Sequence, residues 1–114
     1  MAHDCVFCKI AACEIPSKKV YDDEHVLAFH DINPVAPVHV LVIPKQHIAS
    51  VADFGPEHDE LLGRLFAAVR RVAAETGIAE TGYRVVTNVG KDAGQQVFHI
   101  HLHVLGGRWL GPVA

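Results

Sequence analysis

The chain has 114 residues, of which half are hydrophobic and a fifth charged, and its formal net charge is −3 at pH 7. This is the length of one domain, which we expect to span residues 1–114 and to bury roughly two-thirds of the surface of the unfolded chain. The acidic balance, with no basic stripe, argues against nucleic acid as the main partner.

Cysteine content and apolar segments predict a cytoplasmic chain with no membrane anchor. No basic region followed by a long apolar segment stands at the N-terminus, and no stretch reaches the roughly 20 apolar residues needed to cross a bilayer. The three cysteines, an odd number, are then expected to be reduced thiols or metal ligands.

The N-terminal half predicts a short helix followed by strands. We expect the helix at 6–13 and strands at 18–22, 25–31 and 39–43. Pro16 restricts the end of the helix, and Pro44 ends the last of these strands, an apolar run that we expect to be buried.

The second half predicts one long helix, from about Pro56 to Thr76, and two further strands at 83–89 and 97–105. The expected apolar face of this helix consists of Leu61, Leu62, Leu65, Phe66, Val69, Val72 and Ala73. Gly77 is a suitable stop. Together these elements predict an α+β fold: an antiparallel five-stranded sheet with one long helix and a short N-terminal helix.

Three of the nine histidines alternate in the last predicted strand, at His99, His101 and His103. Alternate residues of a strand share a face, so the three imidazoles would line one face, and Phe98, Ile100, Leu102 and Val104 the other. A solvated strand face is one explanation, but we disfavour it for three histidines in alternation. The others are a metal site made of histidines, and phosphoryl chemistry with one imidazole as nucleophile.

The run His99-Ile-His-Leu-His-Val-Leu105 resembles the histidine-triad (HIT) superfamily, in particular its Hint branch of purine nucleoside phosphoramidases. Four further blocks match in the family's order: Ala28-Phe-His-Asp31, His39-Val-Leu-Val-Ile-Pro-Lys-Gln-His47, Gly94-Gln95 and Leu105-Gly-Gly-Arg108. The matching blocks extend over nearly the whole chain and imply the HIT fold.

The resemblance implies an adenosine 5′-monophosphoramidase type of hydrolase. His101 would attack the phosphate of a purine nucleoside 5′-phosphoramidate and form a covalent nucleotidyl-histidine, which water would hydrolyse to the nucleoside monophosphate. The carbonyl of Gly94 would accept a hydrogen bond from the other nitrogen of His101. His103 would contact phosphate and assist the leaving group, and His39 would support the triad.

The resemblance also assigns the nucleotide-binding residues. Asp31 would bind the ribose hydroxyls, and Asn88 would contact phosphate. Gln95 would lie beside the active site. Gln96 stands where the best-known Hint proteins have serine, so that phosphate contact is left open. The apolar walls around the purine would be Val6, Phe7, Ile10, Phe29 and Ile32, which plain core packing would explain equally well.

Cys5-Val-Phe-Cys8 has the spacing of a zinc knuckle but lacks a second CxxC, so from the residues alone two free thiols are the favoured explanation. A redox motif is disfavoured because no strand precedes it. The resemblance implies a structural zinc ion on Cys5, Cys8, His47 and His99. No catalytic metal is expected, since the histidines supply both nucleophile and donors.

The resemblance further implies a homodimer with the two sheets joined side by side. The residues themselves offer only the apolar tail from Trp109 to Val113 as a surface for a partner. Three alternatives stay open: a dinucleoside polyphosphate hydrolase of the same superfamily, a nucleotide-binding scaffold with incidental catalysis, and a zinc-binding protein with all triad histidines on metal.

Overall fold

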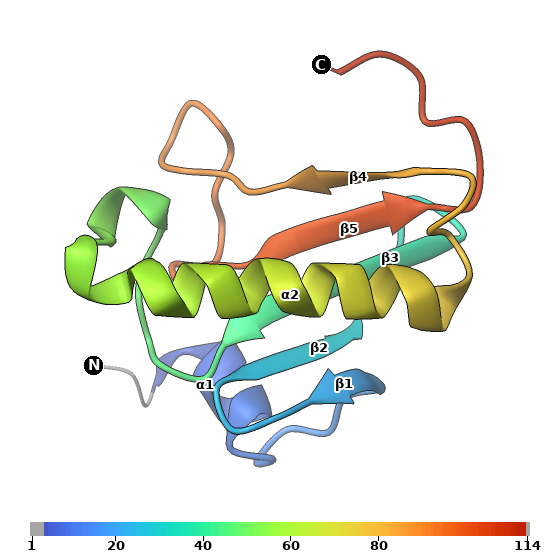
Figure 1. Cartoon of the computed structure of the whole chain (residues 1–114). Helices are drawn as coiled ribbons and strands as arrows, with labels where there is room; N and C mark the ends of the chain where they lie inside the picture. The colour runs from blue at the N-terminus through green and yellow to red at the C-terminus, as the bar shows by residue number, and fades with distance from the viewer. Residues whose placement is uncertain (1–3, 114) are drawn as a thin grey trace.

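The computed structural model describes residues 4–113, so residues 1–3 and 114 of the expected domain lie outside the described range. Five strands form one antiparallel sheet in the order β1-β2-β3-β5-β4 (Figure 1). They are β1 (Lys19–Asp22), β2 (Val26–His30), β3 (Val38–Pro44), β4 (Tyr83–Val86) and β5 (Leu102–Gly106). The predicted α+β class and five-stranded antiparallel sheet are confirmed.

Helix α2 (Asp59–Thr76) lies across one face of the sheet (Figure 1), after the short 3₁₀ turns η2 (Val51–Asp53) and η3 (Pro56–His58). Asp59 and Glu60 favour its positively polarised first turn. At its end Gly77 adopts φ 79° and donates its N–H to the carbonyl of Ala73. The predicted helix at 56–76 is therefore confirmed, except that its first turn is 3₁₀.

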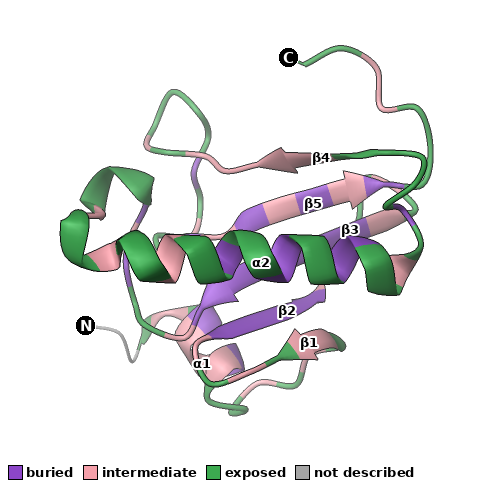
Figure 2. Cartoon of the chain, viewed as in Figure 1, coloured by how far each residue is buried: buried purple, intermediate pink, exposed green. Residues whose placement is uncertain are grey.

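Figure 2 shows that α2 turns its exposed side away from the sheet. Its buried residues are Leu65, Ala68, Val69, Val72 and Ala73. They pack on alternate residues of the strands, among them Val40, Val42 and Val104. The prediction that Phe66 belongs to this face was wrong. Phe66 is 43% exposed, because it lies about 100° around the helix from Leu65.

A second, smaller core covers the opposite face of the sheet. It joins Phe7 and Ile10 of helix α1 (Val6–Ala11) to the other alternate strand residues, Leu27, Phe29, Leu41 and Ile43. The long helix thus stabilises one face, while the short helix covers only part of the other. The uncovered part is where a cavity forms.

The last strand is shorter than predicted. The expected strand at 97–105 is wrong in its first half, because β5 begins at Leu102. Its ladder with β3 ends at the pair Val42–Leu102, and the Ile100 N–H bonds instead to the Ile48 carbonyl at 2.7 Å. His99 and His101 therefore do not share a strand face with His103. Phe98, which alternation places on the same face as the buried Ile100, is 57% exposed.

Among residues 4–113, none of the helices combines the length and the apolar character needed to cross a bilayer.

Candidate active site and metal site

A cavity of about 480 Å³ opens on the sheet face that α2 leaves free. One side is apolar and the other carries histidine, carboxylate and amide groups. Its lining residues are Val6, Phe7, Ile10, Phe29, Asp31, Ile32, Asn33, Leu41, Asn88, Gly94, Gln95, Gln96, Val97, His101 and His103. All the residues expected around a nucleotide border this one space. Three lining residues, Asn33, Leu41 and Val97, were not predicted from the sequence. Leu41 was detectable, because it alternates with His39 in the same apolar run.

His101 is oriented by its own chain segment. Its Nδ1 lies 2.9 Å from the backbone carbonyl of His99. A carbonyl only accepts, so Nδ1 carries the proton and donates it, and Nε2 of the neutral ring keeps its lone pair. The sequence predicted that the Gly94 carbonyl accepts this hydrogen bond. That prediction was wrong, because the backbone carbonyl beside the His101 ring is that of His99. Gly94 instead borders the cavity, in a turn with φ 78°.

His103 and His39 form a hydrogen-bonded pair on neighbouring strands. The backbone N–H of Val35 donates to His39 Nδ1 at 3.2 Å, so His39 carries its proton on Nε2. That Nε2 lies 2.9 Å from His103 Nδ1 and donates to it. His103 must then hold its proton on Nε2. Burial first, then the neighbouring His101 and His39, lowers the pKa of His103 to about 4, so its ring is neutral near pH 7. Burial also lowers the pKa of His39.

Asp31 lies at the end of β2 beside this pair. Its Oδ1 accepts the N–H of Asn33 at 2.8 Å, and its Oδ2 is 3.4 Å from His39 Nε2. The donor atoms of Asp31, His39 and His103 are close enough to suit a metal. However, 2.9 Å between the two imidazole nitrogens is shorter than the about 3.3 Å that two nitrogens on one tetrahedral zinc would keep. Hydrogen bonding explains the spacing better.

Gln95 and Gln96 are neighbours with opposite environments. Gln95 is buried: its Oε1 accepts from Gly90 N–H at 2.9 Å, and its Nε2 donates to the carbonyls of Ala49 and Val97 at 2.8 and 3.1 Å. Its polar atoms are therefore used to hold the loop beside the cavity. Gln96 is exposed at the cavity rim.

The apolar lining residues of the cavity likewise divide into a buried group and an exposed group. Phe7, Ile10 and Phe29 are each less than a tenth exposed and belong to the second core, so they are packing residues as well as cavity walls. Val6 and Ile32 are exposed at the rim, and Ile32 is 91% exposed.

A second cluster, which we call the Cys/His cluster, lies next to the triad segment and consists of Cys5, Cys8, His47 and His99. The four donor atoms lie within 4.8 Å of one another. His99 Nδ1 is 3.4 Å from each of the two sulfurs and 3.2 Å from His47 Nδ1, which is 3.2 Å from the Cys8 sulfur. The sequence prediction that these four residues meet is confirmed in position.

The Cys/His cluster fits a tetrahedral zinc ion. Bond lengths to zinc of about 2.0 and 2.3 Å place nitrogen and sulfur ligands roughly 3.3–3.6 Å apart, close to the observed spacing. The buried His99 donates Nε2–H to the Pro44 carbonyl at 2.8 Å, which turns the lone pair of Nδ1 toward the other three donors. Burial first, and then Cys5, raises the pKa of the Cys8 thiol to about 11, and a bound cation would reverse this effect.

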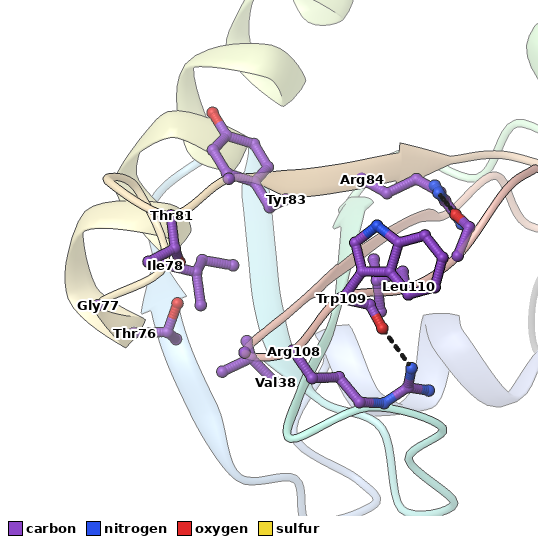
Figure 3. A pocket seen from close by; sticks show the side chains of 13 residues that line it. Val38, Thr76, Gly77, Ile78, Thr81, Tyr83, Arg84, Arg108, Trp109 and Leu110 are labelled. Carbon is purple, nitrogen blue, oxygen red and sulfur yellow. Dashed lines mark hydrogen bonds between the residues drawn. The ribbon is translucent and has the colours of Figure 1, made fainter.

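A larger hollow, of about 790 Å³, lies beside β4, between the loop after α2 and the C-terminal segment (Figure 3). Tyr83, Arg84, Arg108 and Trp109 border it. The described residues that line it include no histidine, cysteine or carboxylate, so it offers no nucleophile of the kind found in the smaller cavity.

Comparison with known proteins agrees with this geometry. A family model described as the HIT domain matches residues 12–110. The purine nucleoside phosphoramidase of Escherichia coli K12 is 49% identical over 113 residues, which cover 99% of this chain and 95% of that protein.

Solved structures show the same fold. A HIT family hydrolase from Clostridium thermocellum is 51% identical with a TM-score of 0.96, covering 99% of this chain and 98% of that one. A histidine triad protein from Clostridium difficile is 47% identical with a TM-score of 0.93, covering 97% and 96%. The chain therefore belongs to the HIT family.

Proposed function

We propose that this protein is a hydrolase that cleaves the P–N bond of purine nucleoside 5′-phosphoramidates and releases the nucleoside monophosphate. The observation that carries the proposal is His101: its Nδ1–H is held by the His99 carbonyl, and its ring borders a cavity with apolar walls and a carboxylate. The similarity to the E. coli purine nucleoside phosphoramidase, at 49% identity, supports the same chemistry.

In the proposed reaction His101 Nε2 attacks the α-phosphorus. A new P–N bond to His101 forms as the P–N bond to the leaving amine breaks, and the amine takes up a proton as it departs. Water then attacks the phosphorus and gives up a proton, which balances the one taken up by the amine, as the P–N bond to His101 breaks and the monophosphate is released. The Nδ1–H bond to the His99 carbonyl supports both steps, because it stabilises the ring as it becomes positively charged.

His103 would act as the neutral donor beside this nucleophile. Its Nδ1 is occupied by His39, so its Nε2–H is left to bond a phosphate oxygen or the leaving nitrogen. The lowered pKa of His103 keeps this arrangement through neutral pH. His39 would then act through His103.

The two ends of the cavity suit the two ends of a nucleoside. Asp31, oriented by Asn33, would accept hydrogen bonds from the ribose hydroxyls through Oδ2. Phe7, Ile10 and Phe29 would form the walls around the purine, with Val6 and Ile32 at the rim. Asn88 and Gln96 are the amides that we assign to the phosphate end, while Gln95 would hold the loop.

The decisive experiment follows release of adenosine monophosphate from adenosine 5′-phosphoramidate and, separately, from diadenosine polyphosphate. We expect release from the phosphoramidate, and its loss in His101→Ala while nucleotide binding survives. Unchanged turnover in His101→Ala would refute the nucleophile. Faster release from the polyphosphate would favour the polyphosphate hydrolase. Tight binding without release from either would favour a nucleotide-binding scaffold.

We also propose that the Cys/His cluster holds a structural zinc ion, which would tie the N-terminal helix to the sheet. The spacing of the four donors and the hydrogen bond from His99 to Pro44 support it. Metal analysis of purified protein should find about one zinc ion per chain. Thiols kept for metal binding also agree with a reducing compartment such as the cytoplasm.

A homodimer joined through β4 is the last part of the proposal. Within residues 4–113 no strand pairs with the outer edge of β4, and the 86% exposed Trp109 borders the hollow beside it. The other edge strand, β1, has an irregular register near Lys19, which disfavours pairing there. Sedimentation equilibrium should give twice the chain mass, and a mass of 12.4 kDa would reject the dimer.

A further inference from the structure

His99 takes part in both sites at once. Its ring places Nδ1 within 3.4 Å of Cys5 and Cys8, while its backbone carbonyl accepts the Nδ1–H of His101. A shift of this one residue would therefore alter the Cys/His cluster and the orientation of His101 together.

Phe7 makes a second connection. It stands between the two cysteines in α1, where Cys5 caps the helix and its sulfur accepts the N–H of Cys8. The Phe7 ring meets the rings of His99 and His101 edge-on, with centroids 6.0 and 5.0 Å apart, and it also borders the cavity. The position of Phe7, which contacts two triad rings, therefore depends on Cys5 and Cys8, which would bind the metal.

We propose that the Cys/His cluster controls the nucleotide site: zinc bound there holds His99 and Phe7 where they orient His101 and complete the apolar wall. His99 and Phe7 are positioning residues in this inference, which rests on the proposed function for the identity of the ligand. It goes beyond a structural zinc ion, because it makes nucleotide affinity depend on metal occupancy.

The local structure explains why the metal matters. Helix α1 has only six residues, too few to be stable without tertiary support. Without metal, its first turn is held by the Cys5 cap and by weak sulfur–nitrogen contacts. The exposed His47 and the half-buried Cys5 border a surface hollow of about 400 Å³, so a chelator can reach the cluster while the core under α2 stays packed.

The test compares protein stripped with a chelator and the same protein reloaded with zinc. Calorimetry measures the Kd of adenosine monophosphate, and long-range ¹H–¹⁵N spectra of the imidazoles report which nitrogen of His101 carries the proton. We expect affinity about tenfold weaker without metal, a mixture of His101 tautomers, and recovery of both on zinc addition.

Three variants test whether the loss of nucleotide affinity comes from the Cys/His cluster itself. His99→Gln removes the metal ligand but retains a donor for the Pro44 carbonyl, and it should behave as the stripped protein does even in zinc. Cys13→Ser changes the exposed thiol outside the cluster and should respond to zinc as wild type does. Phe7→Leu should bind nucleotide more weakly when loaded and should lose most of its response to metal.

Equal affinity and an unchanged His101 tautomer in stripped and loaded protein would overturn the inference. Global unfolding on stripping, seen as loss of far-ultraviolet circular dichroism, would also overturn it and leave a purely structural site. Neither readout depends on turnover, so a failed phosphoramidase assay would refute the proposed function without affecting this test. If adenosine monophosphate does not bind at all, the His101 tautomer still decides.

Discussion

Each of the three triad histidines has one ring nitrogen fixed by a different partner. His99 donates to the Pro44 carbonyl, His101 lies against the His99 carbonyl, and His103 accepts from His39. These partners leave Nδ1 free on His99 and Nε2 free on the other two rings, where Nε2 carries a lone pair on His101 and a proton on His103. One sequence motif thus provides a metal ligand, a nucleophile and a neutral donor in the proposed chemistry.

The first prediction concerns His39, which would act only through His103. In His39→Ala the His103 Nδ1 loses its donor, so the proton of His103 is no longer confined to Nε2. We expect kcat for the phosphoramidate to fall by roughly 10- to 100-fold with a smaller change in KM, since positioning of a proton donor matters most in the transition state. Steady-state kinetics checks this split.

His25→Ala is the matched control, because His25 is a half-exposed histidine whose ring lies 3.7 Å from the surface carboxylate of Glu24. It should leave kcat and KM nearly unchanged. His39→Gln, which retains a side-chain N–H donor, should recover part of the lost kcat. A rise in KM alone for His39→Ala would count against the relay and indicate a role in binding.

At this scale the sequence predicted which residues matter better than what they contact. Alternation pointed to the triad histidines, of which His101 and His103 border one cavity, and the family resemblance correctly predicted that Cys5, Cys8, His47 and His99 meet. The acceptor of His101 was wrongly predicted as Gly94. Hydrogen-bond partners depend on how the backbone passes a ring, and a pattern of residue types does not determine that path.

At the scale of elements, the irregular segment before β5 creates the site. The ladder with β3 ends at Leu102, and on the N-terminal side of Leu102 the N–H of Ile100 bonds to the Ile48 carbonyl instead of to β3. Hydrophobic alternation from 97 to 105 predicts a continuous strand, because a pattern does not show where the neighbouring strand ends. A regular strand would place the three histidines in one environment, whereas the irregular segment buries His99 completely and leaves His101 half-buried.

The adjacent glutamines give an element-scale prediction. Gln95→Ala removes bonds to Gly90, Ala49 and Val97 and leaves buried groups without partners. We expect a loss of about 1–3 kcal/mol in the free energy of unfolding, measured with urea.

Gln96→Ala, one residue further on and exposed, should change the free energy of unfolding by less than about 0.5 kcal/mol. If Gln96 contacts phosphate as proposed, this variant should instead raise KM. Equal destabilisation by the two changes would contradict the assignment of Gln95 as the residue that braces the loop.

At the scale of the whole molecule, the two faces of the sheet have different roles: one forms the main core, and the other carries the candidate sites. One face is closed by α2 over a core of small and branched residues, and the other carries the cavity and the Cys/His cluster. Strand alternation and the helix period could predict the first face, since both follow from repeating burial. The cavity joins α1, β2, β3, β5 and two loops, and its shape depends on contacts that no single period encodes.

The concentration of neutral, buried imidazoles on that second face predicts how the molecule responds to acid. Burial, aided by neighbouring imidazoles, lowers the pKa of His103 from its ordinary 6.5 to about 4 in the folded chain. As the pH falls below 6.5 the unfolded chain therefore binds this proton first. The stabilisation contributed by neutral His103 is complete above pH 6.5 and is lost as the pH falls toward 4, and buried His39 shifts in the same direction.

Urea unfolding of wild type and His103→Gln at about pH 7.5 and about pH 4.5 tests this directly. Between these conditions the wild type should lose more free energy of unfolding than the variant, by on the order of 1 kcal/mol, because water partly screens the half-exposed ring. Release of metal in acid would weaken both proteins alike, so their difference isolates His103. A difference of zero would mean that His103 titrates alike in the folded and unfolded chains, and the neutral donor beside His101 would then have no physical basis in burial.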